Sequence, residues 1–328
     1  MLKNWKAVCK LPGVYLGRSD DFWIEFNRYL EMEKGRGATY YFIPFKNNPG
    51  RGKSAKSPGG RACKYDLGEL RGEIEKLKKN GCEVGVHGID AWVDPERGRE
   101  ELCRVQALTG EREVGLRMHW LYFDRSSPAI MEKAGFSYDS TLGYNDAVGY
   151  RAGTAQVFKL AGSADFLEIP LHLQDTALFY PDRMNLSADR AMERVQELID
   201  NAEKHGGVLT INWHTRSLSP ERLWDDFYSG MLERIERKRV WFATAGQAVR
   251  WFRKRRSVCL EGISDREFSL PRGCEDSTGG PDPGLQIWRL QPGGGHAGRK
   301  GWGRSASAGP AAFLDPPGRM GAAQAQGQ

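Results

Sequence analysis

The sequence predicts an α/β fold in which helices and strands alternate around a mainly parallel sheet or barrel. Short apolar runs rich in β-branched residues recur along the chain, and amphipathic helical patterns separate them. Polar side chains, several of them histidines, directly follow these runs. Because the carboxyl ends of parallel strands meet at one edge of a sheet or barrel, such side chains are expected to gather in one site.

The expected helices show apolar residues at helical spacing and charged residues on the opposite face. Pro128 suits the first turn of one of them, and Gly135 suits its C-terminal cap. Ser187 is the expected N-cap of a long helix. The expected helices cover residues 22–30, 67–79, 95–108, 127–134, 188–204, 220–238 and 245–255.

The expected strands are short runs of apolar, β-branched and aromatic residues. The run that begins at Ala38 is the strongest, because aromatic and β-branched residues dominate it. The expected strands cover residues 38–45, 84–87, 114–117, 136–140, 168–171, 208–214 and 240–243.

The composition changes near residue 257, which divides the chain into two parts. Gly and Pro make up about 31% of residues 257–328, a level at which low-complexity disorder is the default expectation. No sustained apolar period occurs there, so this part cannot bury enough surface to offset its ordering entropy. We expect a folded α/β domain over residues 1–256 and a disordered tail over residues 257–328.

The formal net charge of +6 is modest, and its densest source is the basic group at residues 250–256. We interpret this group as a solvated helix end, where cations interact favourably with the helix dipole. No zinc-finger, RNA-recognition or helix-turn-helix pattern supports a nucleic-acid partner.

The six cysteines form no C-x-x-C pair and no zinc-like spacing with histidine, which indicates free thiols in a reducing compartment. The N-terminus lacks an apolar core of signal-peptide length, and no apolar run approaches the roughly 18 residues of a membrane span. We therefore expect a cytoplasmic chain without a membrane partner and leave its oligomeric state open.

Histidines follow strand ends at His87, His119, His172 and His214. For each, the alternative to a functional role is a hydrogen-bonded or packed histidine of the core. His205 stands at a helix end, where a cation favours the dipole, and is interpreted as structural. The residues that we single out as site candidates, each with such a structural alternative, are His87, Asp90, Arg117, His119, Asp139, Arg151, His172, Asp175, Trp213 and His214.

Several of these segments, in this order, resemble motifs of the polysaccharide deacetylase superfamily with the NodB-homology fold. The segment at 81–87 resembles the motif that delivers a metal-binding histidine, and the segment at 116–119 resembles the following motif with its arginine. Residues 138–140 fall where the fourth motif lies, and residues 209–214 resemble the fifth, whose histidine is a general acid. The resemblance covers about residues 20 to 255, and residues 38–42 resemble the second strand.

The resemblance implies a distorted (β/α) barrel of seven or eight strands, either complete or lacking its first strand. It also implies a divalent metal, usually zinc, which polarises an N-acetyl carbonyl and activates water. On this basis the chain would be a hydrolase of the amide bond in N-acetylated oligo- or polysaccharides. The roles that the resemblance implies are metal binding for His87 and catalysis for His214, Arg117 and Asp139. From the residues themselves we also expect metal binding for His119 and Asp90, and substrate binding for Arg151, Trp213, His172 and Asp175.

The sequence departs from the family pattern at two points. The first motif, a strand that ends in an Asp pair, has no clear counterpart. Asp20 and Asp21 form the nearest pair, but we interpret them as carboxylates at the start of the following helix. Ala91 occupies the place of the second histidine of the second motif, which leaves Asp90 or His119 to complete a metal site. The alternative function is an inactive carbohydrate-binding remnant, or a truncated product, of the same fold.

Overall fold

The computed structural model describes residues 26–53, 59–219, 222–238 and 240–257, with a few residues nearer the two ends. Its main sheet has the order β1-β2-β3-β4-β6-β5, in which only β5 runs antiparallel to its neighbour. The strands of this sheet are β1 (Thr39–Phe42), β2 (Glu83–Gly88), β3 (Leu116–Met118), β4 (Tyr138–Asp139), β5 (Phe158–Lys159) and β6 (Leu167–Glu168).

A second, parallel pair of strands, β7 (Leu173–Gln174) and β8 (Ile211–Asn212), follows β6 along the chain. The segment after β8 returns to the first strand, where the backbone N–H of Ala245 donates to Thr39 Oγ1 over 2.8 Å. A Cβ on Gly37 would lie 2.6 Å from the backbone of Ala243, so these two segments touch. The fold is therefore a mixed α/β fold with a sheet rich in parallel strands, and the closed barrel stays a prediction.

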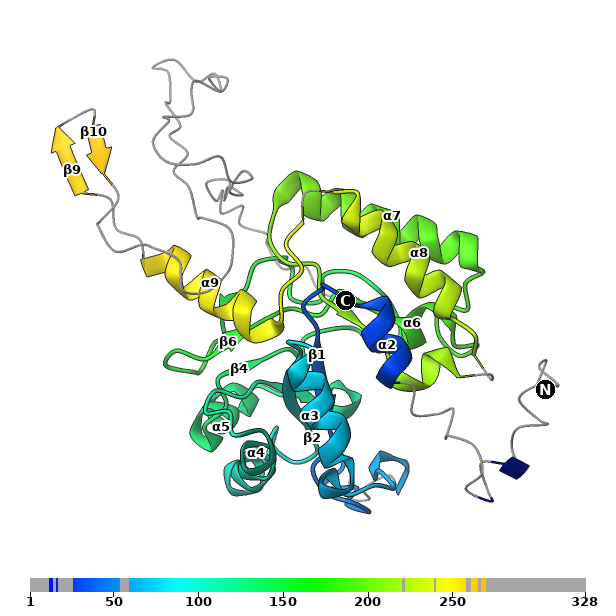
Figure 1. Ribbon diagram of the computed structural model, residues 1–328. Helices are drawn as coiled ribbons and strands as arrows, with labels where there is room; N and C mark the ends of the chain where they lie inside the picture. The colour runs from blue at the N-terminus through cyan, green and yellow to red at the C-terminus, as the bar shows by residue number, and fades with distance from the viewer. Residues whose placement is uncertain are drawn as a thin grey trace, which may run out of the picture.

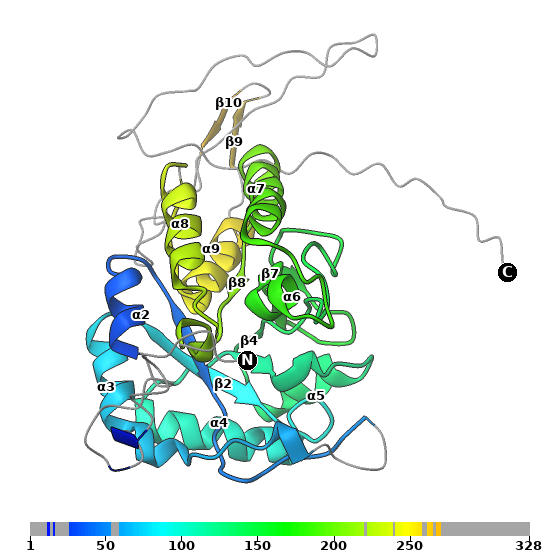
Figure 2. The ribbon, with the colours of Figure 1, turned by 90° about the vertical axis from the view of Figure 1, so that its right-hand side faces the viewer.

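Helices flank the two sheets (Figures 1 and 2). Figure 1 shows α7 and α8 side by side, and Figure 2 shows α6 next to β7 and β8. Helices α3 and α4 pack on β2 of the main sheet, and α5 packs on α4. The helices are α2 (Phe26–Met32), α3 (Arg71–Lys79), α4 (Pro95–Thr109), α5 (Ser127–Ala134), α6 (Asp175–Phe179), α7 (Ala188–His205), α8 (Asp225–Glu236) and α9 (Ala245–Ser257), with 3-10 turns at Gly59–Arg61, Leu67–Leu70, His119–Leu121 and Thr215–Leu218.

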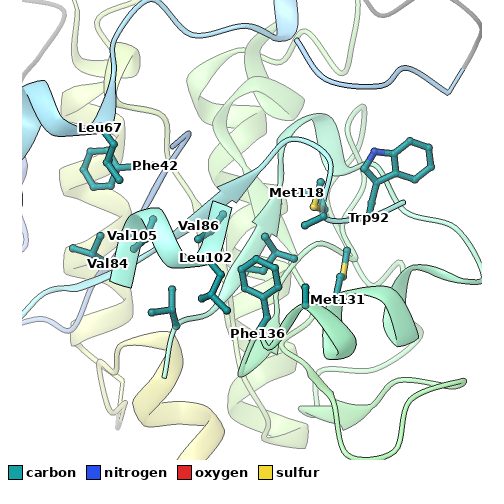
Figure 3. Close-up of a cluster of buried hydrophobic side chains, with 14 of the residues drawn as sticks. Phe42, Leu67, Val84, Val86, Trp92, Leu102, Val105, Met118, Met131 and Phe136 are labelled. Atoms are coloured by element: carbon teal, nitrogen blue, oxygen red, sulfur yellow. The ribbon is translucent and has the colours of Figure 1, made fainter. Parts of the chain in front are cut away.

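The hydrophobic core consists of three clusters that hold the strand ends in place. The largest lies between β1–β3 and helices α3–α5, and Figure 3 shows it with Val84 and Val86 of β2 facing Leu102 and Val105 of α4. A second cluster joins α7 and α8 to β7, and a third packs α9 against β4 and β6. Burying side chains of this size stabilises the fold by about 1.5–3 kcal/mol each.

Two glycines allow the close approach of neighbouring strands. A Cβ on Gly115, just before β3, would lie 1.9 Å from the ring of Tyr138 in β4. A Cβ on Gly85 of β2 would lie 2.7 Å from the ring of Tyr41 in β1. Tyr41 and Tyr138 therefore occupy the space that side chains at these positions would fill.

Most predicted elements are present. Helix α5 has the predicted bounds, Gly135 caps it in a left-handed conformation, and Ser187 caps α7 through a bond from the backbone N–H of Arg190. Helix α8 begins at Asp225 rather than near residue 220, because Leu223 has a φ of 54°, which a helix excludes. Helix α6 was not predicted, and Asp175 forms its first turn.

The predicted strand at 240–243 is not a strand, although Ala245, two residues after it, donates to Thr39 of β1. Two short paired strands, β9 (Glu261–Ser264) and β10 (Glu267–Ser269), lie within the predicted tail, where no strand was expected. The rest of that tail and the Asp20–Asp21 pair lie outside the described residues.

Among the described residues, no helix combines the length and apolarity that crossing a membrane requires. The cytoplasmic location stays a prediction.

Candidate active site

Three of the predicted histidines come together from three strands. His87 lies in β2 near its carboxyl end, His119 follows β3 directly, and His214 follows β8. The ring centroids of His87 and His119 are 4.9 Å apart. The charge of His214 contributes to the pKa of both other rings, which places all three in one neighbourhood.

His87 is held as a neutral ring with a defined tautomer. Its strand register pairs it with Arg117, and its Nδ1 lies 2.9 Å from the Arg117 carbonyl oxygen. Because a carbonyl only accepts, Nδ1 carries the hydrogen and Nε2 keeps its lone pair. Burial first, and then the charge of His119, hold the pKa of His87 well below its ordinary value. A neutral imidazole with a free lone pair can bind a metal ion.

His119 is also neutral and has an unused polar atom. Burial, followed by the charges of Arg61 and His214, lowers its pKa to about 4. Its Nδ1 is buried and has no hydrogen-bond partner within the described part of the chain. Such an orphaned nitrogen is unfavourable in a folded protein unless a ligand satisfies it.

Asp175 and His214 form the best-defined polar pair of the site. The ring Nδ1 of His214 donates to Asp175 Oδ1 over 2.6 Å, and its backbone N–H donates to Oδ2 over 2.7 Å. The hydroxyl of Ser217 donates to the same Oδ2. Burial alone would raise the pKa of Asp175, but the charge and hydrogen bonds of His214 outweigh burial, so the net pKa is lowered. A carboxylate in this position fixes the orientation and tautomer of the ring.

Arg117 is buried, and its guanidinium donates hydrogen bonds to Ser140 and Asn212. Its Nε and Nη2 donate to the backbone carbonyl and the hydroxyl of Ser140 over 3.0 and 2.9 Å. Its Nη1 donates to Asn212 Oδ1 over 3.1 Å, and its guanidinium lies 4.6 Å from the ring centroid of Tyr41. Arg117 thereby links β3, β4 and β8, which supports a positioning role.

Asp139, the third predicted catalytic residue, pairs with Glu168 on the neighbouring strand β6. Both carboxyl groups are fully buried on paired strands, and Asp139 Oδ2 and Glu168 Oε2 find no donor among the described residues. Burial raises the pKa of both, and the charge of Asp139 raises that of Glu168 further. Two adjacent buried carboxyls cannot both ionise, so we infer that Glu168, whose pKa is raised further, keeps a proton beside Asp139. Asp139 is sealed from solvent and does not reach the histidine cluster through any bond among the described residues.

Asp90, the third predicted metal ligand, is turned toward the loop before the 3-10 turn at Gly59–Arg61. Its Oδ1 accepts from the backbone N–H of Arg51 over 2.6 Å. Its own N–H and that of Ile89 donate to the buried carboxylate of Glu101, at 2.8 and 3.1 Å. Among the described residues, no group of three His, Cys, Asp or Glu side chains is placed to hold one ion. The structure therefore gathers His87 and His119 but not Asp90.

The predicted substrate-binding residues have different surroundings. His172 is buried. Its Nδ1 accepts from the backbone N–H of Thr210 over 3.2 Å, and its Nε2 lies 3.4 Å from the carbonyl oxygen of Thr154. These contacts match the alternative of a hydrogen-bonded histidine in the core. Trp213 stacks on Tyr228 with ring centroids 4.9 Å apart and belongs to the second core cluster. Arg151 donates to the Gly143 carbonyl over 2.8 Å and is exposed.

Sequence reasoning missed four residues that shape the site. The sequence could have indicated Glu168, because a charged residue inside an apolar run needs a buried polar partner. The indication for Glu101 is weaker, as it lies on the apolar face of α4. Ser217 and Asn212 carry no distinguishing pattern, and only their contacts with Asp175 and Arg117 reveal them.

No protein-family model matches this sequence. A curated protein, the peptidoglycan deacetylase-like protein FGM2 of Gibberella zeae, is 29% identical over 86 residues, which are 24% of this chain and 25% of that protein. The chain thus matches about a quarter of the length of this curated relative.

One solved structure is similar in fold, and a second matches only loosely. The first, called a "putative polysaccharide deacetylase" from Mycobacterium smegmatis, has a TM-score of 0.51 and 19% identity, with 81% of this chain and 89% of that chain covered. Another structure, also called a "putative polysaccharide deacetylase" and from Bordetella bronchiseptica, has a TM-score of 0.36 and 18% identity, with 69% of this chain and 82% of that chain covered. This match is too loose to support an argument. In fold over most of its length, and in sequence over a shorter segment, this chain resembles the polysaccharide deacetylase superfamily, which confirms the resemblance drawn from its motifs.

Proposed function

We propose that this chain is a polysaccharide deacetylase-like hydrolase that cleaves the amide C–N bond of N-acetylated sugars. The observation that carries the proposal is the Asp175–His214 pair, which lies beside the two neutral histidines His87 and His119. The names of the similar proteins support a polysaccharide substrate. An oligo- or polysaccharide with N-acetyl groups is the substrate class that these findings support together.

In this proposal His214 is the general acid. Its Nδ1–H is committed to Asp175, so Nε2 is the ring atom that remains to hold a proton and give it to the leaving amine nitrogen. The carboxylate of Asp175 holds the ring in the orientation and tautomer that aim Nε2 away from the core. Ser217 donates to the same carboxylate and helps to keep it in place.

His87 and His119 would hold a divalent ion, and zinc is among the metals that imidazole ligands suit. The free lone pair of His87 Nε2 and the orphaned Nδ1 of His119 support this assignment. When bound, such an ion would supply Lewis-acid polarisation of the acetyl carbonyl. Asp90 would contribute a third ligand, as the resemblance implies, only if its carboxylate left the Arg51 N–H.

Arg117 acts in this proposal by positioning. Its carbonyl fixes the tautomer of His87, and its guanidinium ties the end of β3 to Ser140 and Asn212. Asp139 acts in this proposal as a buried structural residue beside Glu168 and makes no contact with substrate.

The test is acetate release from N-acetylated oligosaccharides and from peptidoglycan by the full chain, with and without added zinc. The wild type is expected to release acetate, and His214→Gln is expected to lose turnover while it keeps its metal content. His205→Gln, at the exposed end of α7, is the matched control and is expected to behave as the wild type. Sugar binding without any acetate release under all these conditions would instead support the carbohydrate-binding alternative.

A further inference from the structure

The backbone carbonyl of His214 accepts a hydrogen bond from a tyrosine that is far away in the sequence. The hydroxyl of Tyr29, in helix α2, donates to this oxygen over 2.7 Å across a separation of 185 residues. The backbone N–H of Ser217 donates to the same oxygen over 2.8 Å, within the 3-10 turn that follows His214. Because Asp175 already holds the ring Nδ1 and the backbone N–H of His214, ring Nε2 is the one polar atom of this residue without a hydrogen-bond partner in the described part of the chain.

Burial fixes both the ring and the proton of Tyr29. Its side chain is buried, and its ring packs edge-on against that of Tyr228 in α8, with centroids 5.9 Å apart. Burial first, and then the negative charge of Asp175, raise the pKa of Tyr29 above its ordinary value. The hydroxyl of Tyr29 therefore keeps its proton and acts as a donor to the His214 carbonyl.

Helix α2 is itself fastened to both β1 and α8. Glu33, directly after the helix, accepts from the hydroxyl of Tyr40 in β1 over 2.7 Å. Near the start of the helix, Arg28 forms an ion pair with Asp225, the first residue of α8. Tyr29 lies between these two contacts along the chain, so they set its position relative to both elements.

We propose that Tyr29 is a positioning residue for His214, whose hydroxyl fixes the segment after β8 so that Nε2 stays directed at the substrate. Asp175 and Tyr29 hold the N–H and the C=O of the same residue from two different helices, α6 and α2. Both contacts are needed because a displacement of about 1 Å at a reacting atom can lower a rate strongly. This inference rests on the proposed function, in which Nε2 gives its proton to the leaving amine.

Tyr29→Phe in the full chain removes only the hydroxyl and is expected to lower kcat for acetate release about threefold to tenfold, with unchanged KM and metal content. The variant should fold, because the backbone N–H of Ser217 still satisfies the His214 carbonyl. Tyr65→Phe is the matched control, since it removes a hydroxyl that accepts from the backbone N–H of Ile43 over 3.0 Å beside the first core cluster. This control is expected to lose stability and keep its kcat. A kcat in Tyr29→Phe equal to that of the wild type, or a change in KM instead of kcat, would overturn the proposal.

Hydrogen–deuterium exchange followed by mass spectrometry tests the positioning without any turnover. In Tyr29→Phe the backbone N–H groups of residues 212–218 are expected to exchange faster than in the wild type, while exchange in β2 and α4 stays the same. Tyr65→Phe should leave the exchange of residues 212–218 unchanged. Faster exchange throughout the chain of Tyr29→Phe would mean that the hydroxyl only supports the overall fold. Unchanged exchange at residues 212–218 would mean that it does not hold this segment, and either result would overturn the proposal.

The two measurements distinguish a failure of this inference from a failure of the proposed function. If the wild type releases no acetate under any condition, the hydrolase assignment fails, and the exchange of residues 212–218 alone decides whether Tyr29 holds His214 in place. Acetate release with the same kcat in wild type and Tyr29→Phe would overturn the positioning role alone.

Discussion

The carboxylate of Asp175 holds His214 at two points, its ring Nδ1 at 2.6 Å and its backbone N–H at 2.7 Å. The two residues are brought together by the parallel pairing of β7 with β8, because Asp175 follows β7 and His214 comes two residues after Asn212 of β8. The double contact fixes both the position of the loop and the direction of the ring. It leaves His214 Nε2 as the atom that can act on a substrate.

Replacing Asp175 by Asn is expected to lower kcat about 10- to 100-fold with little change in KM, because an amide does not hold the ring in its orientation and tautomer as firmly. Steady-state kinetics of acetate release measure this, and thermal melting checks that the variant folds. Asp182→Asn, at an exposed turn residue, is the control. A kcat equal to that of the wild type would show that the pair is only structural.

Removing either His87 or His119 is expected to remove bound metal, because each would supply one imidazole nitrogen. Elemental mass spectrometry of the purified chain measures the metal content per chain, independently of activity. Asp90→Asn is expected to retain metal, because the structure commits its carboxylate to the Arg51 N–H. Loss of metal in Asp90→Asn, with retention in His119→Ala, would reverse this assignment.

Stability is expected to fall as the pH drops from about 6.5 toward 4. Burial lowers the pKa of His172 from 6.5 to about 4, so the unfolded chain binds more protons in this window. The contribution of His172 to the free energy of unfolding is complete above pH 6.5 and is lost as the pH falls through 4. At pH 5 the loss amounts to about 2 kcal/mol. Urea unfolding at several pH values should show a shallower loss for His172→Asn. His205→Asn, at the exposed end of α7, should leave the profile unchanged.

The Asp139–Glu168 pair predicts that stability falls as the pH rises above about 4.5. The pKa of Glu168 is raised well above 4.5, so the folded chain binds more protons than the unfolded chain above this pH. The contribution of Glu168 is therefore complete below about pH 4.5 and is lost as the pH rises through its raised pKa.

Glu168→Gln replaces the proton kept by Glu168 by an amide N–H that does not titrate. The variant should gain in free energy of unfolding relative to wild type between pH 5 and pH 8. Glu75→Gln, on the exposed face of α3, is the control. Parallel pH profiles of wild type and Glu168→Gln would contradict a proton kept by Glu168.

Gly115→Ala is expected to destabilise the fold by about 1–3 kcal/mol, because its Cβ would overlap the Tyr138 ring. The displaced hydroxyl of Tyr138 would also lose its 2.6 Å hydrogen bond to Glu83. Gly230→Ala in α8, where nothing lies within 4 Å of the new Cβ, should instead stabilise by about 0.5–1 kcal/mol. Urea denaturation compares the two, and equal effects would refute the close approach of β3 and β4.

Local patterns predicted the elements where apolar period and end signals agree. Ser127–Ala134 ends at Gly135 as predicted, because proline and glycine set its two ends. The segment at 240–243 misled the prediction, because its apolar residues serve contacts with neighbouring segments without a strand ladder. Leu223 likewise delayed the start of a predicted helix, because it adopts a left-handed backbone conformation that its residue type does not predict.

The sequence alone determined which residues stand at strand ends, although three of the four histidines placed there gather and His172 lies in the core. This is a local property, because two or three residues after an apolar run suffice to define it. Only the tertiary structure decided the partners: Asp175 for His214, Glu168 for Asp139, and the Arg51 N–H rather than a metal for Asp90. These partners lie 29 to 39 residues apart in the chain. Strand order, register and the direction of each side chain select them, and no short-range pattern encodes those choices.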